Sequence, residues 1–268
     1  MSAIPDPAGY ALVTGGGTRL GAAMVRRLAA DGWRVAIHHK ASGEYAKALA
    51  QEINAGGGHA VTVGGDLAVL DDFAGLFAEA NAAYGFCSLL VNSASAFEYD
   101  DIASISRATL EKLFAVNLHA PMLLARDFAA QLRDGSRGLI VNILDQKVFN
   151  LNPDFLSYTL TKSALEAATR LLAQAMAPRV RVCGIAPGLT LRSGDQTAEG
   201  FAKAHASTPL GFGSEPQDIA ATLSFLTQVP AITGTTIIVD GGQHLEARSH
   251  DVMFSYGVAP DAPVGRKR

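Results

Sequence analysis

The chain has 268 residues, of which 49% are hydrophobic and 18% are charged, and its formal net charge is -3. A chain of this length can form one large domain with a well-buried core. The near balance of charges gives no sign of a basic surface, so we expect a small molecule as the partner, with no nucleic acid and no membrane.

Seven short apolar runs have the composition of strands that are buried on both faces. They span residues 11–13, 35–37, 60–63, 89–91, 139–143, 180–185 and 236–239. Segments with helical periodicity alternate with them, at residues 22–30, 46–53, 73–83, 110–132, 158–176 and 219–226. This alternation predicts an α/β fold, a single-domain Rossmann fold with a doubly wound, seven-stranded parallel sheet flanked by helices.

The end of the chain differs in composition from the rest. Asp240-Gly241-Gly242 predicts a sharp turn after the last strand, and residues 247–268 show little periodicity. We therefore expect a domain over residues 1–246 and a C-terminal tail over residues 247–268, either flexible or packed on a neighbouring subunit.

Three features bear on the compartment. Cys87 and Cys183 lie far apart in apolar runs, without a metal-binding spacing, and are expected to be reduced core residues. Residues 219–239 carry no charge and are about as long as a membrane span, but Pro230 and Gly234 divide them more naturally into a helix, a turn and a strand. The N-terminus lacks a basic segment followed by an apolar run, so we expect no secretory signal and a cytoplasmic enzyme.

The first strand leads into a glycine-rich turn and then into a helix. The turn reads Thr14-Gly15-Gly16-Gly17-Thr18-Arg19-Leu20-Gly21. Such a turn lets the backbone approach a pyrophosphate, while the helix N-terminus supplies N–H donors and partial positive charge. A structural turn could have the same composition, but the position after the first strand favours a dinucleotide site.

The end of the second strand indicates which dinucleotide is bound. An acidic residue there would bind the ribose of NAD and repel a 2′-phosphate. This chain has His38-His39-Lys40-Ala41-Ser42 instead, and Arg19 adds a cation nearby, so NADP(H) is the expected cofactor. In Gly65-Asp66-Leu67, after the third strand, Asp66 could accept a hydrogen bond from the adenine amino group or could cap its loop.

A tyrosine, a lysine and an aspartate form the candidate reaction centre. Tyr158 and Lys162 are four residues apart, which places both side chains on one face of a helix, and Asp145 precedes the tyrosine by thirteen residues. A nearby cation favours the phenolate, so Lys162 would lower the pKa of Tyr158 and make it useful for proton transfer at neutral pH.

The ordered motifs of residues 8–245 resemble the short-chain dehydrogenase/reductase family. They are Thr14-Gly15-x-x-x-Arg19-x-Gly21, Asn92-Ser93-Ala94-Ser95, Asn117, Tyr158-x-x-x-Lys162, Pro187-Gly188 and Asp240-Gly241-Gly242. The resemblance implies that Tyr158 donates or accepts the proton, that Lys162 also holds the nicotinamide ribose, and that Asn117 supports a proton-relay water. It also implies cofactor contacts from Asn92-Ser93-Ala94 and Pro187-Gly188, and it suggests a homotetramer paired through residues 110–132 and 158–176.

Three positions depart from the common family pattern. Arg19 replaces a glycine, Ser93 and Ser95 replace an asparagine and a glycine, and Asp145 replaces the usual catalytic serine. Arg19 and Asp145 are similar to the pteridine reductase subgroup, which reduces pterins, dihydropterins or dihydrofolate with NADPH. Ser95 and Phe97 are then implied in substrate binding, with the Phe97 ring stacked on the pterin, although Phe97 could equally be a packing residue. That subgroup commonly has an arginine at the position of Ala41, which puts the strength of 2′-phosphate binding in doubt, although Lys40 could substitute.

An aspartate in place of serine changes the expected chemistry. A carboxylate would repel a developing alkoxide, whereas a carboxyl group can deliver a proton to a ring nitrogen during reduction of a C=N bond. The hypothesis is therefore a pterin or dihydrofolate-type reductase that uses Asp145, Tyr158 and Lys162. Two alternatives are a related enzyme for a ketone, sugar or acyl thioester and a nucleotide-sensing protein without turnover. Asp145 could also simply cap the loop before its helix.

Overall fold

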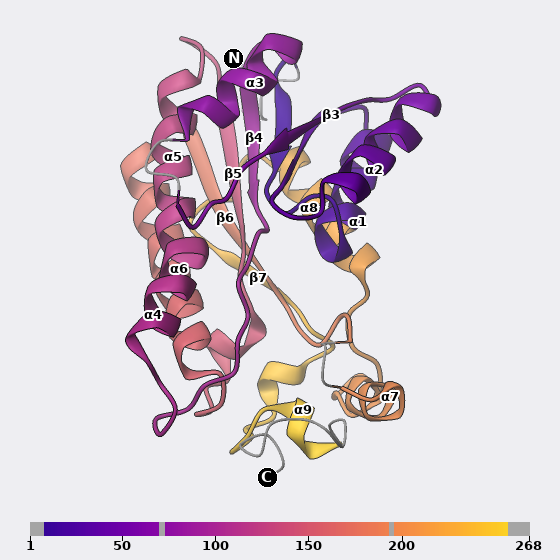
Figure 1. Cartoon of the computed structure of the whole chain (residues 1–268), viewed down its shortest axis with the longest axis vertical. Helices are drawn as coiled ribbons and strands as arrows, with labels where there is room; N and C mark the ends of the chain where they lie inside the picture. Colours follow the sequence, from indigo (N-terminus) through magenta and orange to yellow (C-terminus); the bar gives the residue numbers. More distant parts are fainter. Residues whose placement is uncertain (1–7, 70–72, 193–195, 257–268) are drawn as a thin grey trace.

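The computed structural model describes residues 8–69, 73–192 and 196–256, and its centre is one sheet of seven strands (Figure 1). The strands are β1 (Tyr10–Val13), β2 (Arg34–His39), β3 (His59–Gly64), β4 (Cys87–Asn92), β5 (Gly138–Ile143), β6 (Val180–Pro187) and β7 (Thr236–Val239). They are all parallel and lie in the order β3-β2-β1-β4-β5-β6-β7. The order reverses between β1 and β4, so the predicted doubly wound Rossmann sheet is confirmed.

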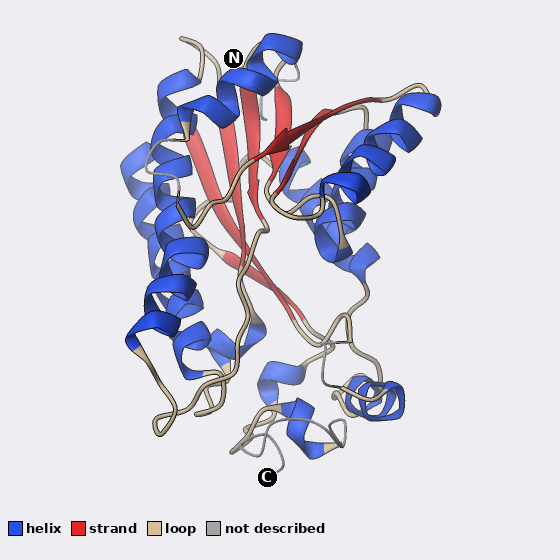
Figure 2. Cartoon of the chain, in the orientation of Figure 1, coloured by secondary structure: helices blue, strands red, loops and turns tan. Residues whose placement is uncertain are grey.

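Helices cover both faces of this sheet (Figure 2). The longer ones are α1 (Arg19–Ala30), α2 (Gly43–Ala55), α3 (Ala74–Tyr84), α4 (Arg107–Phe114), α5 (Ala120–Gln131), α6 (Leu156–Met176), α7 (Ala198–Ala206) and α8 (Pro216–Gln228). Helices α1, α2 and α8 pack on one face, and α3, α5 and α6 pack on the other. The short helix α9 (Val252–Ser255) lies near α7, beyond the sheet.

Alternation along the strands divides the core into two layers. In β1, Ala11 and Val13 face the layer of α1, α2 and α8, whereas Tyr10 and Leu12 face the layer of α3 and α5. Because both faces are covered, β1, β4 and β5 are buried along their whole lengths. This explains why the strands appear in the sequence as continuous apolar runs.

The helical segment expected over residues 110–132 contains a π-turn. The structure has α4, then a π-turn over Ala115–His119, and then α5. One extra residue in that turn brings Asn117 into the interior, where it is 1% exposed. The expected helical segment is therefore present, whereas the π-turn within it was not predicted, because apolar periodicity does not register a single wide turn.

Other features of the sequence are found where they were expected. The uncharged stretch 219–239 is divided between α8 and β7, and none of the described helices is long and apolar enough to cross a membrane. Cys87 and Cys183 are buried and free. Helices α7 and α9 were not anticipated, since both are short and lie in segments with weak periodicity.

Candidate active site

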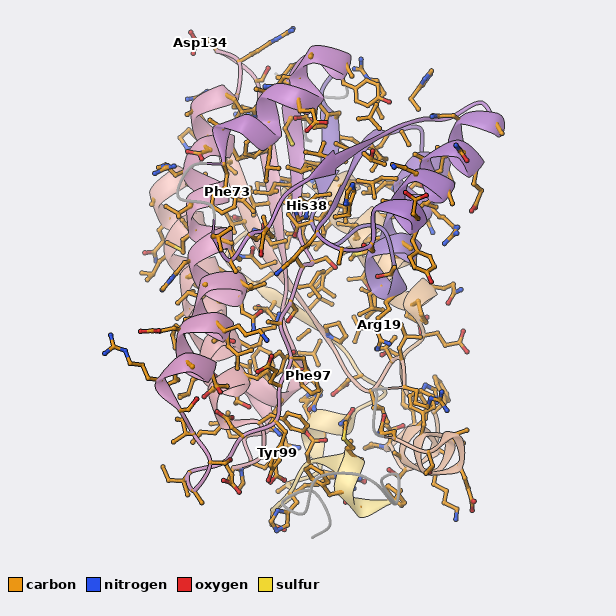
Figure 3. All side chains as sticks on the ribbon, viewed as in Figure 1. Arg19, His38, Phe73, Phe97, Tyr99 and Asp134 are labelled. Atoms are coloured by element: carbon orange, nitrogen blue, oxygen red, sulfur yellow. The ribbon has the colours of Figure 1, made fainter. Side chains whose placement is uncertain are left out.

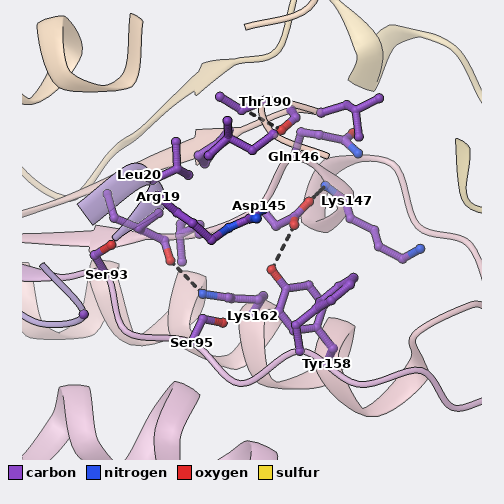
Figure 4. A pocket seen from close by; sticks show the side chains of 18 of the residues that line it. Arg19, Leu20, Ser93, Ser95, Asp145, Gln146, Lys147, Tyr158, Lys162 and Thr190 are labelled. Carbon is purple, nitrogen blue, oxygen red and sulfur yellow. Dashed lines mark hydrogen bonds between the residues drawn. The ribbon is translucent and has the colours of Figure 1, made fainter. Parts of the chain in front are cut away.

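The carboxyl ends of β1, β4, β5 and β6 open into a cavity of about 490 Å³ (Figure 4). The strand order reverses at β1 and β4, which is where ligands bind in doubly wound sheets. The wall of the cavity combines the glycine-rich turn, the segment after β4, the segment after β5, the first turns of α6 and the segment after β6. The lining includes Gly15, Thr18, Arg19, Leu20, Gly21, Ser93, Ala94, Ser95, Phe97, Asp145, Tyr158, Lys162, Pro187 and Gly188, all of them predicted site residues.

The glycine-rich turn and the segment after β4 are bonded together. The Thr14 hydroxyl accepts hydrogen bonds from the backbone N–H groups of Ser93 at 2.9 Å and Ala94 at 3.0 Å. Gly15 has φ +62°, and a Cβ atom there would lie 3.0 Å from the Ala94 Cα atom, so the position favours glycine on both counts. A Cβ atom at Gly21 would lie 2.1 Å from the Gly15 carbonyl oxygen. The turn therefore holds the N-terminus of α1 close to the cavity, as a bound pyrophosphate requires.

His38 has a different role from the one expected of it. It is 2% exposed, its Nδ1 accepts from the Gly15 N–H at 3.3 Å, and its Nε2 pairs with the Gly65 carbonyl oxygen at 3.1 Å. Burial lowers the pKa of His38 to about 4, so the ring is neutral at pH 7. Both ring nitrogens bind backbone, and His38 positions the glycine-rich turn instead of contributing a cation to a 2′-phosphate.

The other residues near the end of β2 remain accessible. Lys40 is exposed and forms an ion pair with Asp66 at 2.6 Å. Asp66 also caps its own loop by accepting from the Ala68 N–H at 3.0 Å, so the alternative expected for this aspartate is observed. Ser42 precedes α2 without a capping bond from its side chain, and its hydroxyl is 3.2 Å from where a Gly17 Cβ atom would lie. A hydroxyl and an ammonium are thus present beside the glycine-rich turn.

Two other expected cofactor residues have mainly structural contacts. The Leu67 side chain belongs to the buried core, and His39 Nδ1 pairs with the Lys40 carbonyl oxygen at 3.4 Å.

Arg19, at φ +51°, donates from both terminal nitrogens to the Arg192 carbonyl oxygen, at 3.2 and 3.3 Å. Arg19 therefore joins the glycine-rich turn to the segment after β6, at the cavity wall. Arg19 and Phe97 both lie toward the end of the molecule that carries α7 and α9 (Figure 3).

Asp145 and Tyr158 are directly bonded in the cavity. The Tyr158 hydroxyl donates to Asp145 Oδ2 at 2.9 Å (Figure 4). Asp145 Oδ1 accepts from the Lys147 N–H at 2.9 Å, which caps a short 3-10 helix over Gln146–Phe149. The capping alternative and the reaction-centre interpretation are therefore both compatible with the position of this aspartate, because each oxygen has its own partner.

The pKa values of Asp145 and Tyr158 are both raised. Burial raises the pKa of Asp145, although the Lys147 N–H and the Tyr158 hydroxyl oppose this. The pKa of Tyr158 is raised well above its usual value, by burial and by the charge of Asp145. The expectation that Lys162 lowers the pKa of Tyr158 stays a prediction, and burial and the adjacent carboxylate act in the opposite direction. The tyrosine is protonated at neutral pH, which suits a proton donor.

Lys162 lies beneath the tyrosine ring. Its Nζ donates to the Ile143 carbonyl oxygen at 2.8 Å and lies 5.7 Å from the centre of the Tyr158 ring. Burial lowers the pKa of Lys162 to about 8, while the charge of Asp145 partly opposes this. The ammonium group thus loses its proton more easily than an exposed lysine does.

The side chains of Asn117 and Asn92 each join two segments of the chain beside the cavity. The Asn117 side chain accepts from the Ala96 N–H at 2.8 Å and donates to the Ala96 carbonyl oxygen at 2.9 Å and to the Thr161 hydroxyl at 3.1 Å. It thereby fastens the segment after β4 to α6. Asn92 donates to Asn142 Oδ1 at 2.8 Å and so links β4 to β5. Neither amide contacts the Tyr158 hydroxyl in this structure.

Phe97 belongs to an aromatic cluster at the cavity. Its ring stacks on Phe155 with centres 4.5 Å apart and meets the Tyr158 ring edge-on at 4.7 Å. Phe97 lines the cavity and is nevertheless 45% exposed. One part of the ring is therefore a packing surface, and another part remains open to a flat ligand. Ser95, next to it, donates to Asn117 Oδ1 at 3.3 Å.

The cavity also contains residues that sequence reasoning missed. They are Ile143, Leu144, Gln146, Lys147, Leu189, Thr190, Leu191, Gln243, Asp251, Val252 and Met253. Thr190 could have been found from its place after Pro187-Gly188, and its hydroxyl pairs with that of Ser214 at 2.7 Å. Gln243 fixes the same segment by accepting from the Leu189 N–H at 3.0 Å. Lys147 and Asp251 carried no such signal.

The described part of the C-terminal tail, residues 247–256, packs on its own chain. Asp251 Oδ2 accepts from Lys147 Nζ at 2.9 Å, and its N–H donates to Asp154 at 2.7 Å. The expectation of a flexible or neighbour-bound tail also covers residues 257–268, which lie outside the described residues.

A comparison with protein families agrees with this geometry. The family model for short chain dehydrogenases matches residues 9–223. The chain belongs to the short-chain dehydrogenase family. The sheet order of this chain agrees with a doubly wound dinucleotide-binding fold, in which ligands bind outside the carboxyl ends of the strands. The protein is accordingly an oxidoreductase, and the resemblance stated from its motifs is confirmed.

Individual members differ in substrate. The structure of FolM alternative dihydrofolate reductase 1 from Brucella suis, in complex with NADP, is 44% identical, covers 91% of this chain and 98% of its own, and has a TM-score of 0.87. Pteridine reductase 1 from Leishmania tarentolae is 31% identical, over 88% of this chain and 96% of its own. A 3beta-hydroxysteroid dehydrogenase from Eggerthella lenta is 32% identical, over 87% of this chain and 93% of its own. Membership alone therefore does not select the substrate.

Proposed function

We propose that this protein is an NADPH-dependent reductase of a pterin, dihydropterin or dihydrofolate-type substrate. The observation that carries the proposal is the bond between the Tyr158 hydroxyl and Asp145 in the cavity. An aspartate in contact with the tyrosine is poorly suited to stabilise an alkoxide, because a carboxylate repels that charge. It is well suited to exchange a proton with a ring nitrogen.

The cofactor is NADP(H), and the residues of the cavity fit it. Gly15 and Gly21 allow the tight turn at the N-terminus of α1, where backbone N–H groups can approach a pyrophosphate. Lys40 and the Ser42 hydroxyl lie where a 2′-phosphate would be bound, without a carboxylate at the end of β2. Lys40 would exchange its partner Asp66 for the phosphate. The NADP complex of the Brucella suis relative supports this choice.

The substrate is inferred from the other end of the cavity. A flat heterocycle would stack on the open part of the Phe97 ring, with its polar edge toward Asp145 and Tyr158. Amino and ring N–H groups of a pterin are donors that a carboxylate accepts, whereas a ketone offers no donor. The names of the Brucella and Leishmania relatives support this class of substrate.

The proton chemistry follows from the raised pKa values. Bound NADPH supplies a hydride to a carbon of the substrate. Asp145, whose pKa is raised by burial, holds a proton more readily than an exposed aspartate and can deliver it to the adjacent nitrogen. Tyr158 donates a hydrogen bond to that carboxyl group and so orients it toward the substrate. Lys162 provides positive charge below the tyrosine ring.

Consumption of NADPH with a panel of substrates tests the proposal. We expect turnover with dihydrobiopterin and dihydrofolate and much slower turnover with ketones, sugars and 3-oxoacyl thioesters. Faster turnover with a ketone would contradict it and would place the protein among the carbonyl reductases of the family. Binding of NADPH without turnover of any of these compounds would point to a nucleotide-sensing role.

We also propose a homotetramer in the cytoplasm. Helices α5 and α6 leave apolar side chains exposed on their outer surfaces, among them Met122, Leu160 and Leu171, the last of these 65% exposed. Contact with a second copy would bury them. Light scattering should give about four times the chain mass of 28.0 kDa, and Leu171→Glu should lower it. A monomeric wild-type protein would contradict the proposal.

A further inference from the structure

The segment 251–254 forms one wall of the cavity. Asp251, Val252 and Met253 line it, and Met253 packs in a cluster with Leu113, Phe155 and Tyr158. Phe254 stacks on Phe155 with centres 6.0 Å apart and planes at 11°. Since Phe155 also stacks on Phe97, this wall continues the aromatic surface on the substrate side.

A buried ion pair holds the wall. Lys147 Nζ donates to Asp251 Oδ2 at 2.9 Å, and the two side chains are 4% and 20% exposed. Asp251 Oδ1 accepts from the Met253 N–H at 3.0 Å. A buried pair contributes little net stability over an apolar one of equal size, but removal of one partner leaves an uncompensated charge. Such a pair is therefore better suited to fix a geometry than to add stability.

The same pair is connected to the reaction centre. Asp145 accepts from the Tyr158 hydroxyl with one oxygen and from the Lys147 N–H with the other, each at 2.9 Å. An unbroken series of hydrogen bonds therefore runs from Tyr158 through Asp145, Lys147 and Asp251 to Met253. The charge of Asp251 is also close enough to raise the pKa of both Asp145 and Tyr158.

We propose that Lys147 and Asp251 are positioning residues that fix residues 251–254 as the substrate-selective wall of the cavity. The chain supplies this wall to its own site, through a contact between residues 104 positions apart. The choice of a dihydropterin as the test substrate rests on the proposed function, whereas the role of the pair in holding the wall does not. None of the hydrogen bonds described above joins this pair to the glycine-rich turn that would bind NADPH.

Variants of the pair test the proposal in the full chain. Lys147→Met leaves Asp251 unpaired and should raise the KM for dihydrobiopterin by about tenfold or more, because a small misplacement of the wall disturbs the bound substrate. The Kd of NADPH should stay within about twofold of wild type, and kcat should fall less than KM rises. Asp251→Asn should also raise the KM for dihydrobiopterin. Because this change nearly preserves the shape of the side chain, it provides the test if Lys147→Met does not fold. The double variant should recover part of the loss, since no uncompensated carboxylate remains.

Glu246→Gln is the matched control. Glu246 directly precedes the tail and pairs with Arg248 in it, but neither residue lines the cavity, so the KM of Glu246→Gln should equal that of wild type. An unchanged KM in folded Lys147→Met and Asp251→Asn would overturn the proposal. An equal loss of NADPH affinity would also overturn it, because the pair would then support the whole fold.

Hydrogen exchange separates this proposal from the proposed function. The Met253 amide is bonded to Asp251, so its exchange should be faster in Lys147→Met than in wild type, whatever the substrate. If wild type does not reduce pterins, the proposed function fails, and exchange still decides the role of the pair. Unchanged exchange at Met253 would overturn that role.

Discussion

At the scale of single residues, the arrangement of Asp145, Tyr158 and Lys162 determines the protonation states. The sequence predicts that these three side chains meet, because of their spacing and the motifs around them. It does not predict that burial and the carboxylate together raise the pKa of Tyr158. That effect depends on the direction of the Tyr158 hydroxyl, which donates to Asp145 in the structure. A pattern of residue types carries no information on such directions.

Lys162 gives this centre a pH dependence. Its pKa is lowered to about 8, so the ammonium form is present below this pH and is lost as the pH rises through it. Asp145 acts with the same sign, since its proton is also lost as the pH rises. We therefore expect kcat/KM for the dihydropterin to fall above about pH 8. Steady-state rates measured across about pH 6–10 give kcat/KM, whose pH dependence reports the pKa values of groups in the free enzyme.

A kcat/KM that stays constant to about pH 10, near the pKa of an ordinary lysine, would contradict this expectation. Lys162→Met should be less active throughout and should lack the part of the alkaline decline that comes from the lysine. Its Kd for NADPH serves as a check that the cavity is intact.

At the scale of elements, the strands were predicted well and the π-turn between α4 and α5 was not. The central strands β1, β4 and β5 are buried on both faces and therefore stand out as apolar runs, as in Leu89–Val91. The π-turn at Ala115–His119 gives no such signal, because apolar residues continue through it. It nevertheless decides where Asn117 points, and hence how the segment carrying Ser95 and Phe97 is held.

Loss of the Asn117 side chain should affect both stability and substrate binding. In Asn117→Ala, the Ala96 N–H and carbonyl groups lose their partner, which should lower the free energy of unfolding by on the order of 2–3 kcal/mol. The KM for the dihydropterin should also rise, because Phe97 follows Ala96 directly. Denaturant unfolding and steady-state kinetics measure the two effects.

Asn54→Ala provides a matched control. Asn54 bonds the N–H and carbonyl groups of Ala60 in the same way, at 2.7 and 3.0 Å, and does not line the cavity. Asn54→Ala should lose less stability, because Asn54 is exposed and water can replace part of its bonding, and its KM should be unchanged. Equal KM values for the two variants would mean that Asn117 has no particular influence on the site.

At the scale of the whole molecule, contacts between distant segments complete the site, and these were the least predictable. Lys147 and Asp251 are separated by 104 positions, and neither belongs to a periodic pattern. His38 likewise joins the turn after β1 to the segment after β3, although the sequence suggested an exposed cation. Propensity and periodicity describe local structure, so they do not reveal such pairings.

His38 should make the fold sensitive to acid. Its pKa is about 4 in the folded chain and about 6.5 in an unfolded one, so the unfolded state binds more protons between these values. Stability from this residue is complete above about pH 6.5 and is lost as the pH falls, by on the order of 3 kcal/mol at pH 4. His38→Gln can keep one donor and one acceptor, and its unfolding free energy should decrease less between these pH values. An identical decrease in wild type and variant would contradict this role.

The most direct test of the central claim is the effect of Asp145→Ser on dihydropterin reduction. The account predicts that kcat for dihydrobiopterin falls by about 100-fold or more, because the acid beside Tyr158 is lost, while the Kd of NADPH stays unchanged. Asp145→Asn should keep the cap on the Lys147 N–H and lose the same activity. Undiminished dihydropterin reduction by the purified, folded serine variant would contradict the account.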